Sequence, residues 1–478
     1  MENSKLVRLL KSLNQYEIRQ FRDFLCSPVF NKKKILIRLF DELKKYYPDF
    51  KSDKLSDEKL YASVYPDKKY DYFKLKNSIS DLFILGKEYL EFSGFRKDED
   101  AKERYLLKEL RFRSLLNIFQ QVHKSALQRN EKKLEKDEQY LQHKLSLTVE
   151  ELNYLTPQMP NMHLQYQQKM LDLFLEYSLI KIFKVYNVMM HEEKQNNFKY
   201  DKYLFDELMT FTDKSKFDNP TLRVYHQIIS LESNRNDENF YKLKGIGEKY
   251  KNSLSVYDTY MVFLHLNGYC ANEFNVNSRT DLATIHFEII KDKNETDYTT
   301  LGSLLYPDFI NEIKIALRAD EIKWAEDYIE KNKSRLSSEK ENTIYFCNAV
   351  LNLKKGNPEK ALELLSKTNF PNFIIKVQVK LLQLQILYEL EYFEQVFSSI
   401  DNFRHYIKRE STIKEDFKET FYEFVNILNA LIKLKTLNSE NGKDYELNKI
   451  NSDIENMRSN QFGLKLWLKD MVKSDYKF

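Results

Sequence analysis

Residues 345–365 read YFCNAVLNLKKGNPEKALELL, and this stretch decides the fold. Apolar side chains recur every three or four positions on both sides of a central Gly-Asn-Pro, as they do in two amphipathic helices joined by a short turn. The stretch therefore predicts a helical hairpin, with one helix over residues 345–355 and the second over residues 358–366.

Small or β-branched residues lie at matching places in three successive hairpins of this kind. Ala325, Ala361 and Val396 are 36 and 35 residues apart along the chain. A spacing of this size is typical of stacked helical repeats, in which no single unit can bury its apolar face alone. The upstream hairpin is wider, because Ala283 lies 42 residues before Ala325. We therefore expect an irregular array, an architecture that favours binding over catalysis.

The same succession of helix and turn extends through the second half of the chain, from residue 219 onward. The expected helix pairs cover residues 221–231 with 239–250, 256–272 with 281–291, 309–319 with 323–331, 345–355 with 358–366, and 374–390 with 393–403. A long helix over residues 417–434 and a last helix that carries Trp467 and Leu468 follow. We expect this last helix to cap the open end of the stack.

The hairpin at residues 345–365 resembles the tetratricopeptide repeat. Gly356-Asn357-Pro358-Glu359-Lys360-Ala361-Leu362 is similar to that family's turn and to the start of its second helix, with Ala349 and Ala361 at the two small positions. In the neighbouring units, Asp320 and Glu391 stand where the turn glycine would be. The resemblance implies a degenerate, tetratricopeptide-like (TPR-like) α-solenoid over the last half of the chain.

The first 95 residues are expected to form a module of short helices. Asn14 and Glu17 have the spacing of a capping box, and Gly86 falls on the apolar face of a later helix, where another helix is expected to cross closely. The segments SPVFN (27–31), YPDF (47–50) and KLKNSISDL (74–82) resemble the N-terminal region of a family of uncharacterised bacterial proteins. That resemblance implies a tetratricopeptide-like second half and no assigned activity.

Long helices are expected between this module and the array, because neither glycine nor proline occurs from residue 95 to residue 156. The apolar pattern of this part places Tyr105 and Leu106 on one buried face. It places Leu171 and Phe174 on the buried face of a following, strongly apolar helix.

The overall composition favours an all-α fold. Only nine glycines and nine prolines occur in 478 residues, too few for a fold rich in tight β-turns or phosphate-binding loops. The predicted organisation is an N-terminal helical module at 1–95, a long-helix middle region at 96–215, and a helical-hairpin superhelix with a C-terminal capping helix at 216–478.

The charge is nearly balanced, and the cysteines indicate a reducing compartment. The 76 basic and 72 acidic residues leave a net charge of only +4, and the three cysteines have no disulfide-framework or zinc-ligand spacing. No apolar run is long enough for a signal peptide or a membrane span. We therefore expect a cytoplasmic protein with no membrane partner.

Motifs that carry catalytic or cofactor chemistry are incomplete in this sequence. His191-Glu192-Glu193 lacks the second histidine that a zinc-protease helix requires four residues on. Gly245-Ile246-Gly247 lacks the third glycine and the preceding strand of a dinucleotide-binding turn, and we interpret it as a break within or between helices. No P-loop or nucleophile-elbow sequence occurs. We therefore assign no catalytic, cofactor-binding or metal residue and expect a protein that is not an enzyme and needs no cofactor.

The expected function is that of a non-catalytic scaffold that binds a protein or peptide in the concave groove of the array. The first helix of each hairpin, at residues 309–319, 345–355 and 374–390, would line the groove. The alternative is a regulatory protein whose N-terminal module binds nucleic acid, since residues 1–95 contain 19 Lys and Arg against 14 Asp and Glu. The sequence leaves the partner-binding residues, the partner and the oligomeric state open.

Overall fold

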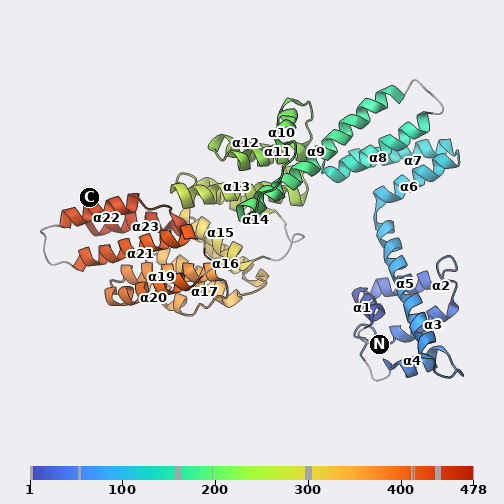
Figure 1. The fold of residues 1–478 in the computed structure, drawn as a ribbon, viewed down its shortest axis with the longest axis horizontal. Coiled ribbons are helices and arrows are strands. Elements are labelled where there is room, and N and C mark those ends of the chain that lie inside the picture. The colour runs from blue at the N-terminus through green and yellow to red at the C-terminus, as the bar shows by residue number, and fades with distance from the viewer. Residues whose placement is uncertain are drawn as a thin grey trace. The chain divides into compact units, whose positions relative to one another are not determined.

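The chain is helical throughout the part that its computed structural model describes, which comprises residues 4–51, 55–156, 163–195, 198–296, 304–410, 413, 415–436 and 443–476. These residues form 23 α-helices packed in sequential order, without a strand among them (Figure 1). The all-α prediction is confirmed. Across the described ranges, no helix combines the length and the apolar character that a membrane span would need.

The chain divides into two compact units. The first comprises Met1–Lys132 and Gln142–Leu173, and the second comprises Lys133–Leu141 and Phe174–Phe478. The boundaries expected from the sequence near residues 95 and 215 stay predictions. Each unit is described by itself below.

The first unit starts with a cluster of helices around one apolar core, which includes Phe21, Phe40 and Leu82 of α2, α3 and α5. The helices of this unit are α1 (Lys5–Ser12), α2 (Gln15–Cys26), α3 (Lys34–Lys44), α4 (Asp57–Val64), α5 (Tyr72–Lys97), α6 (Glu99–Phe112), α7 (Leu116–Glu131) and parts of α8 (Glu138–Leu155) and α9 (His163–Gln195).

Two local predictions for the N-terminal helices are confirmed. Asn14 Oδ1 accepts the backbone N–H of Glu17 at 2.9 Å, and Glu17 Oε2 accepts the N–H of Asn14 at 3.1 Å, which completes the capping box of α2. Gly86 on α5 lies against Leu9 of α1, so closely that a Cβ atom on Gly86 would be 3.2 Å from the leucine methyl groups. A glycine is therefore used here for a close helix crossing.

The second unit continues the chain as a succession of helical hairpins. Its helices are the remainder of α9, then α10 (Phe205–Lys214), α11 (Pro220–Ser233), α12 (Asp237–Tyr250), α13 (Val256–Asn277), α14 (Ala283–Glu295), α15 (Tyr306–Arg318), α16 (Ile322–Asn332), α17 (Lys340–Lys354), α18 (Pro358–Ser366), α19 (Phe373–Glu389), α20 (Phe393–Arg409), α21 (Glu415–Thr436), α22 (Lys443–Glu455) and α23 (Leu464–Tyr476). The expected pairs from α11–α12 to α19–α20 are all present.

Three of these hairpins turn in the same way. Asp320, Gly356 and Glu391 all have a left-handed backbone, with φ of 65°, 76° and 58°. In each turn the N–H of the following residue donates to a carbonyl five residues earlier, at 2.9–3.0 Å, as in a Schellman motif. The common geometry places the second helix of each hairpin at the same point relative to the first, although only one turn has the glycine that φ > 0 favours.

The small residues that set the spacing lie inside these hairpins. Ala325, Ala361 and Val396 are fully buried, and so is Ala349 on α17, the first helix of the hairpin that carries Ala361. Because a larger side chain at these points would push the helices apart, the short side chains permit the close contact between the two helices of each hairpin.

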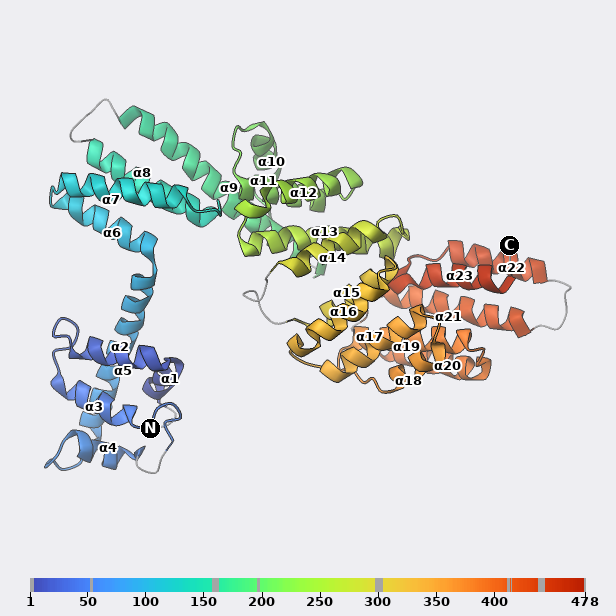
Figure 2. The ribbon, with the colours of Figure 1, turned by 180° about the vertical axis from the view of Figure 1, so that it is seen from behind.

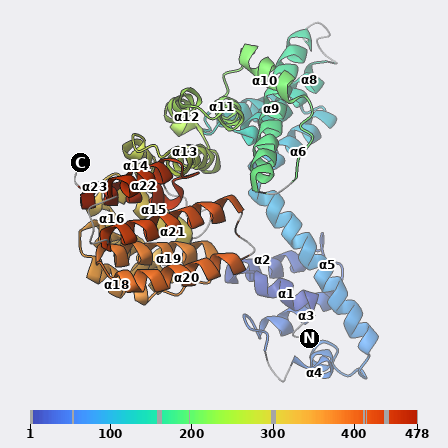
Figure 3. The ribbon, with the colours of Figure 1, turned by 60° about the vertical axis from the view of Figure 1, so that its left-hand side comes forward.

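The C-terminal part of the second unit returns to an earlier helix. Residues 457–463, here called the C-terminal turn, contact α13: Asn460 N donates to Asn275 O at 2.7 Å, and Asn460 Nδ2 donates to Phe274 O at 3.0 Å. Figures 2 and 3 show the last three helices, α21, α22 and α23, lying beside one another. Leu468 of α23 is buried, and this helix packs on α21.

Two apolar stripes that we expected to be buried are half exposed. Tyr105 and Leu106 on α6 retain about half of their surface, and so do Leu171 and Phe174 on α9. Leu110 and Phe183, elsewhere on the same helices, are buried. The expectation was wrong because the spacing of apolar residues predicts a helix and the position of its apolar face. Whether that face is buried depends on which other element covers it.

Gly245 and Gly247 do not break a helix, contrary to the sequence interpretation. Both lie inside the continuous helix α12. A Cβ atom on Gly247 would be 2.8 Å from Cγ1 of Val262 on α13, whereas one on Gly245 would meet nothing within 4 Å. The second glycine therefore permits α12 and α13 to pack closely.

Replacing each of these two glycines with alanine is expected to have a different effect on the stability of the second unit. Gly245→Ala should stabilise the second unit by about 0.5–1 kcal/mol, because alanine loses less backbone entropy in a helix. Gly247→Ala should be less stable than Gly245→Ala by about 1–3 kcal/mol, because its methyl group would overlap the stiff side chain of Val262. Urea unfolding followed by tryptophan fluorescence measures both, and equal stabilities would contradict the close crossing.

Candidate functional site

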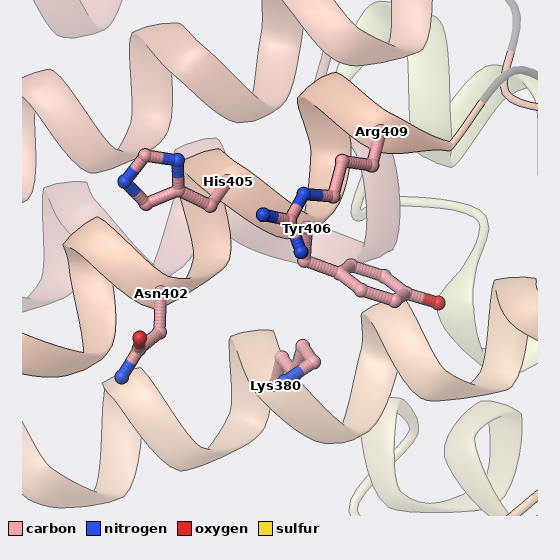
Figure 4. Close-up of a pocket in the computed structure, with 5 residues that line it drawn as sticks. All are labelled: Lys380, Asn402, His405, Tyr406 and Arg409. Atoms are coloured by element: carbon pink, nitrogen blue, oxygen red, sulfur yellow. The ribbon is translucent and has the colours of Figure 1, made fainter.

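A surface pocket of about 500 Å³ lies on the hairpin formed by α19 and α20, and its lining is polar and basic (Figure 4). The residues that line it are Lys380 from α19 and Asn402, His405, Tyr406 and Arg409 from α20. The four α20 residues share one face because they are spaced three or four positions apart. The helix spacing thus brings three basic groups and one aromatic ring to the same place.

The aromatic ring holds one of the basic groups in position. Lys380 Nζ lies 5.1 Å from the centre of the Tyr406 ring, within the range of a cation–π contact. Burial raises the pKa of the Tyr406 phenol, and the carboxylate of Glu410 contributes to the same shift. Tyr406 therefore stays neutral at physiological pH and provides a flat wall with a hydroxyl donor.

The positive charge of the pocket is not neutralised within the part of the chain that the structure describes. Lys380, His405 and Arg409 form no ion pair within 4.0 Å there, whereas the nearby Arg404 pairs with Asp401 at 3.6 Å. A guanidinium can bind a carboxylate or a phosphate through two parallel hydrogen bonds. The pocket is therefore suited to an acidic group.

A second pocket, of about 470 Å³, lies on α21 and α22. It includes Lys433 and Glu446, whose charges oppose each other, together with the apolar Ala430 and Leu434. Its lining therefore favours neither an acidic nor a basic ligand, and the pocket on α19 and α20 is the stronger candidate for a binding site.

The pocket coincides only in part with the expected groove. Lys380 comes from α19, one of the three first helices that were expected to line the groove, but the other four residues come from α20, a second helix. On α15, Lys314 lies 5.3 Å from the centre of the Phe462 ring in the C-terminal turn. Part of the surface on which a partner was expected is therefore covered by the chain itself. This contact could not be predicted from the sequence, because Phe462 lies more than 140 residues after Lys314 along the chain.

Some lysines of the N-terminal module contact their own neighbours. Lys33 pairs with Asp81 at 2.6 Å, and Lys45 pairs with Glu42 at 2.7 Å. Lys74 lies over the ring of Tyr65, with 4.7 Å between Nζ and the ring centre. These contacts give no specific support to a nucleic-acid surface, and nucleic-acid binding by this module stays a prediction.

One set of possible metal ligands occurs in the described residues of the first unit. His143 Nε2 on α8 is 3.5 Å from Asp100 Oδ1 and 3.2 Å from Glu103 Oε2, both on α6. The guanidinium of Arg129 pairs with the same glutamate. Because this cation already balances Glu103, the group is accounted for as a partly buried ion-pair network. Its only sequence signal is Glu103 on the apolar face that carries Leu107.

The candidate nucleophiles of the second unit are deeply buried. Burial raises the pKa of the Cys270 thiol to about 12, and it raises the pKa of Cys347 as well. Thiols in this state are not reactive nucleophiles at neutral pH. His191, in the incomplete zinc-protease motif, lies near the exposed end of α9.

Comparison of the chain with protein-family models, with curated proteins and with solved structures gives no match. The function is therefore argued from the geometry and charge of the second unit.

Proposed function

We propose that this chain is a non-catalytic binding protein whose second unit, a tetratricopeptide-like array of hairpins, holds an acidic segment of a protein partner. The pocket on α19 and α20 is the contact point. The observation that supports the proposal is the group of three basic side chains, Lys380, His405 and Arg409, beside the Tyr406 ring and without a carboxylate within ion-pair distance in the described residues.

The dimensions of the pocket fit this role. A volume of about 500 Å³ accommodates one or two side chains of a peptide but is open enough for the peptide backbone to continue across the surface. Asn402 contributes an amide that can donate to a peptide carbonyl and accept from a peptide N–H. Because the five groups lie on two packed helices, the surface is preformed and little ordering is required on binding.

A charge-reversal experiment tests the proposal. A short fluorescein-labelled peptide rich in glutamate is titrated with the full chain, and fluorescence anisotropy gives the dissociation constant. Lys380→Glu combined with Arg409→Glu should weaken binding by about tenfold or more, because each lost charge-assisted hydrogen bond is worth about 1.5–3 kcal/mol.

The matched control changes the same number of charges elsewhere in the second unit. Lys323→Glu combined with Lys331→Glu alters two exposed lysines of α16 and should leave the dissociation constant within about twofold, apart from long-range electrostatics. If both double variants weakened peptide binding equally, the peptide would be responding to the net charge of the protein alone, and this result would contradict the proposal. A single-stranded oligonucleotide that binds more tightly than the peptide would also contradict it.

A further inference from the structure

Two basic residues one helical turn apart on α15, Lys314 and Arg318, face other helices of the second unit. Lys314 Nζ donates a hydrogen bond to Gln378 Oε1 of α19 at 2.8 Å. Arg318 Nε donates to the carbonyl of Lys314 at 3.3 Å, and its guanidinium lies 4.0 Å from the centre of the Phe274 ring of α13. Both side chains keep partial contact with solvent. They are thus fixed in position but still accessible.

No carboxylate balances these two charges. Among the described residues, no acidic group lies within 4.0 Å of either, while other half-buried lysines of the same unit, such as Lys184 and Lys435, each pair with two carboxylates. Desolvated charges without a partner reduce stability. A pair of such charges on one helix face is therefore unexplained by the packing of the protein alone.

The titratable groups that face the pair do not supply a negative charge. Burial, together with the charge of Arg318, lowers the pKa of Lys314 to about 7, and burial lowers the pKa of Arg318 to about 10. The neighbouring groups are Cys347, Cys270 and His286, and burial keeps the thiols protonated and the imidazole neutral. The site is consequently positive and lacks a counter-ion from the protein.

Three elements fix the positions of the two side chains. Phe274 lies at the C-terminal part of α13, Gln378 lies on α19, and Phe462 belongs to the C-terminal turn. The hydrogen bonds of Asn460 to the backbone of α13 hold that turn in place. The Nε donor of Arg318 is used by the Lys314 carbonyl, and the N–H groups on the two terminal nitrogens of its guanidinium are the donors that can bind an oxyanion.

We propose that Lys314 and Arg318 form a binding site for a small oxyanion, either a phosphate group or a carboxylate. The site uses residues distinct from the pocket on α19 and α20, so it does not depend on the proposed binding of an acidic segment. In this site the anion supplies the charge that neutralises both cations and accepts hydrogen bonds from the edge of the guanidinium.

Isothermal titration calorimetry on the full chain tests the site, with sodium sulfate, sodium phosphate and sodium acetate as probes. Ionic strength is kept constant with sodium chloride, so that a general salt effect cancels. We expect saturable binding at one site. Arg318→Gln and Lys314→Gln should each weaken it about tenfold or more, and Lys323→Gln on the exposed face of α16 should leave it unchanged. Preference for phosphate over acetate assigns a phosphate source, and the reverse preference assigns a carboxylate.

The pH dependence of sulfate binding gives an independent readout, because the charge of sulfate is constant near neutral pH. A bound anion favours the charged amine of Lys314, so binding should take up a proton and weaken as the pH rises from about 6 to about 8. The Lys314→Gln variant should lose this dependence. Intrinsic fluorescence establishes that each variant is folded.

Three results would overturn the site. The first is no saturable binding of any probe beyond that of chloride. The second is binding that persists undiminished in folded Arg318→Gln and Lys314→Gln proteins. The third is binding lost in the Lys380→Glu and Arg409→Glu double variant but kept in Arg318→Gln, which would place the anion in the pocket on α19 and α20 instead.

Discussion

Replacing Asp258 with alanine is expected to destabilise the second unit by about 3–5 kcal/mol, the cost of breaking a buried ion pair from one side. Asp258 on α13 is fully buried. Its carboxylate accepts hydrogen bonds from Tyr225 at 2.9 Å and from Ser255 at 2.8 Å, and it lies 2.8 Å from Lys184 Nζ of α9. Without it, three polar groups would lose a partner inside the protein.

The charges around Lys184 explain why the loss is large. Burial alone would lower the pKa of this amine, but Asp258 and Glu138 outweigh burial and raise the pKa, so the lysine stays charged. Removing one carboxylate leaves that charge with only Glu138, at 2.6 Å. Asp258→Asn keeps the hydrogen-bonding shape and should cost less than Asp258→Ala.

Urea unfolding followed by tryptophan fluorescence measures this effect selectively, because both tryptophans, Trp324 and Trp467, belong to the second unit. The matched control is Glu238→Ala on α12, which removes an exposed carboxylate paired with Lys242 and should change the stability by less than about 0.5 kcal/mol. A loss below about 1 kcal/mol for Asp258→Ala would contradict the structural role of the network.

Ala361→Leu is expected to destabilise the same unit by about 1–3 kcal/mol through overpacking. Ala361 on α18 is fully buried, α18 packs on α17, and the small residue Ala349 of α17 is also fully buried. The additional carbons of leucine have no space at this contact, so the two helices must separate or adopt strained side-chain conformations.

The control for Ala361→Leu lies on the same helix. Glu359→Leu adds a leucine at an exposed position of α18 and should remain within about 0.5 kcal/mol of the natural chain. The same fluorescence-detected unfolding compares the two variants. If Ala361→Leu were as stable as Glu359→Leu, the contact between the hairpin helices would not be the tight one that the spacing of small residues predicts.

Local features of the fold were predictable in detail. The capping box at Asn14, the close crossing at Gly86 and the hairpin turns depend on residues within a few positions of each other or on one helical period. Asp320 and Glu391 adopt the left-handed conformation without being glycine, and only their spacing from Gly356 indicated this. Here the hairpin packing outweighs the residue's own preference.

The candidate sites were not predictable from local pattern. The basic pocket needs Lys380 of one helix beside Arg409 of the next, and nothing in either helix distinguishes these residues from the many other basic residues of the chain. Lys314 and Arg318 look like ordinary surface residues of α15 in the sequence. Their importance depends on Phe274 and Phe462, which belong to other elements.

Periodicity and turn chemistry are therefore enough to specify an all-helical chain with hairpins at residues 309–403, since each of these signals acts over a few residues, and the spacing of the small residues repeats the same local pattern from one hairpin to the next. The burial of charge is different, because desolvation depends on every element packed around a group. Long-range packing alone makes Asp258 a buried ion-pair partner and leaves Lys314 and Arg318 without a counter-ion. The same packing brings the C-terminal turn against α13, across part of the surface that the hairpin pattern had left open.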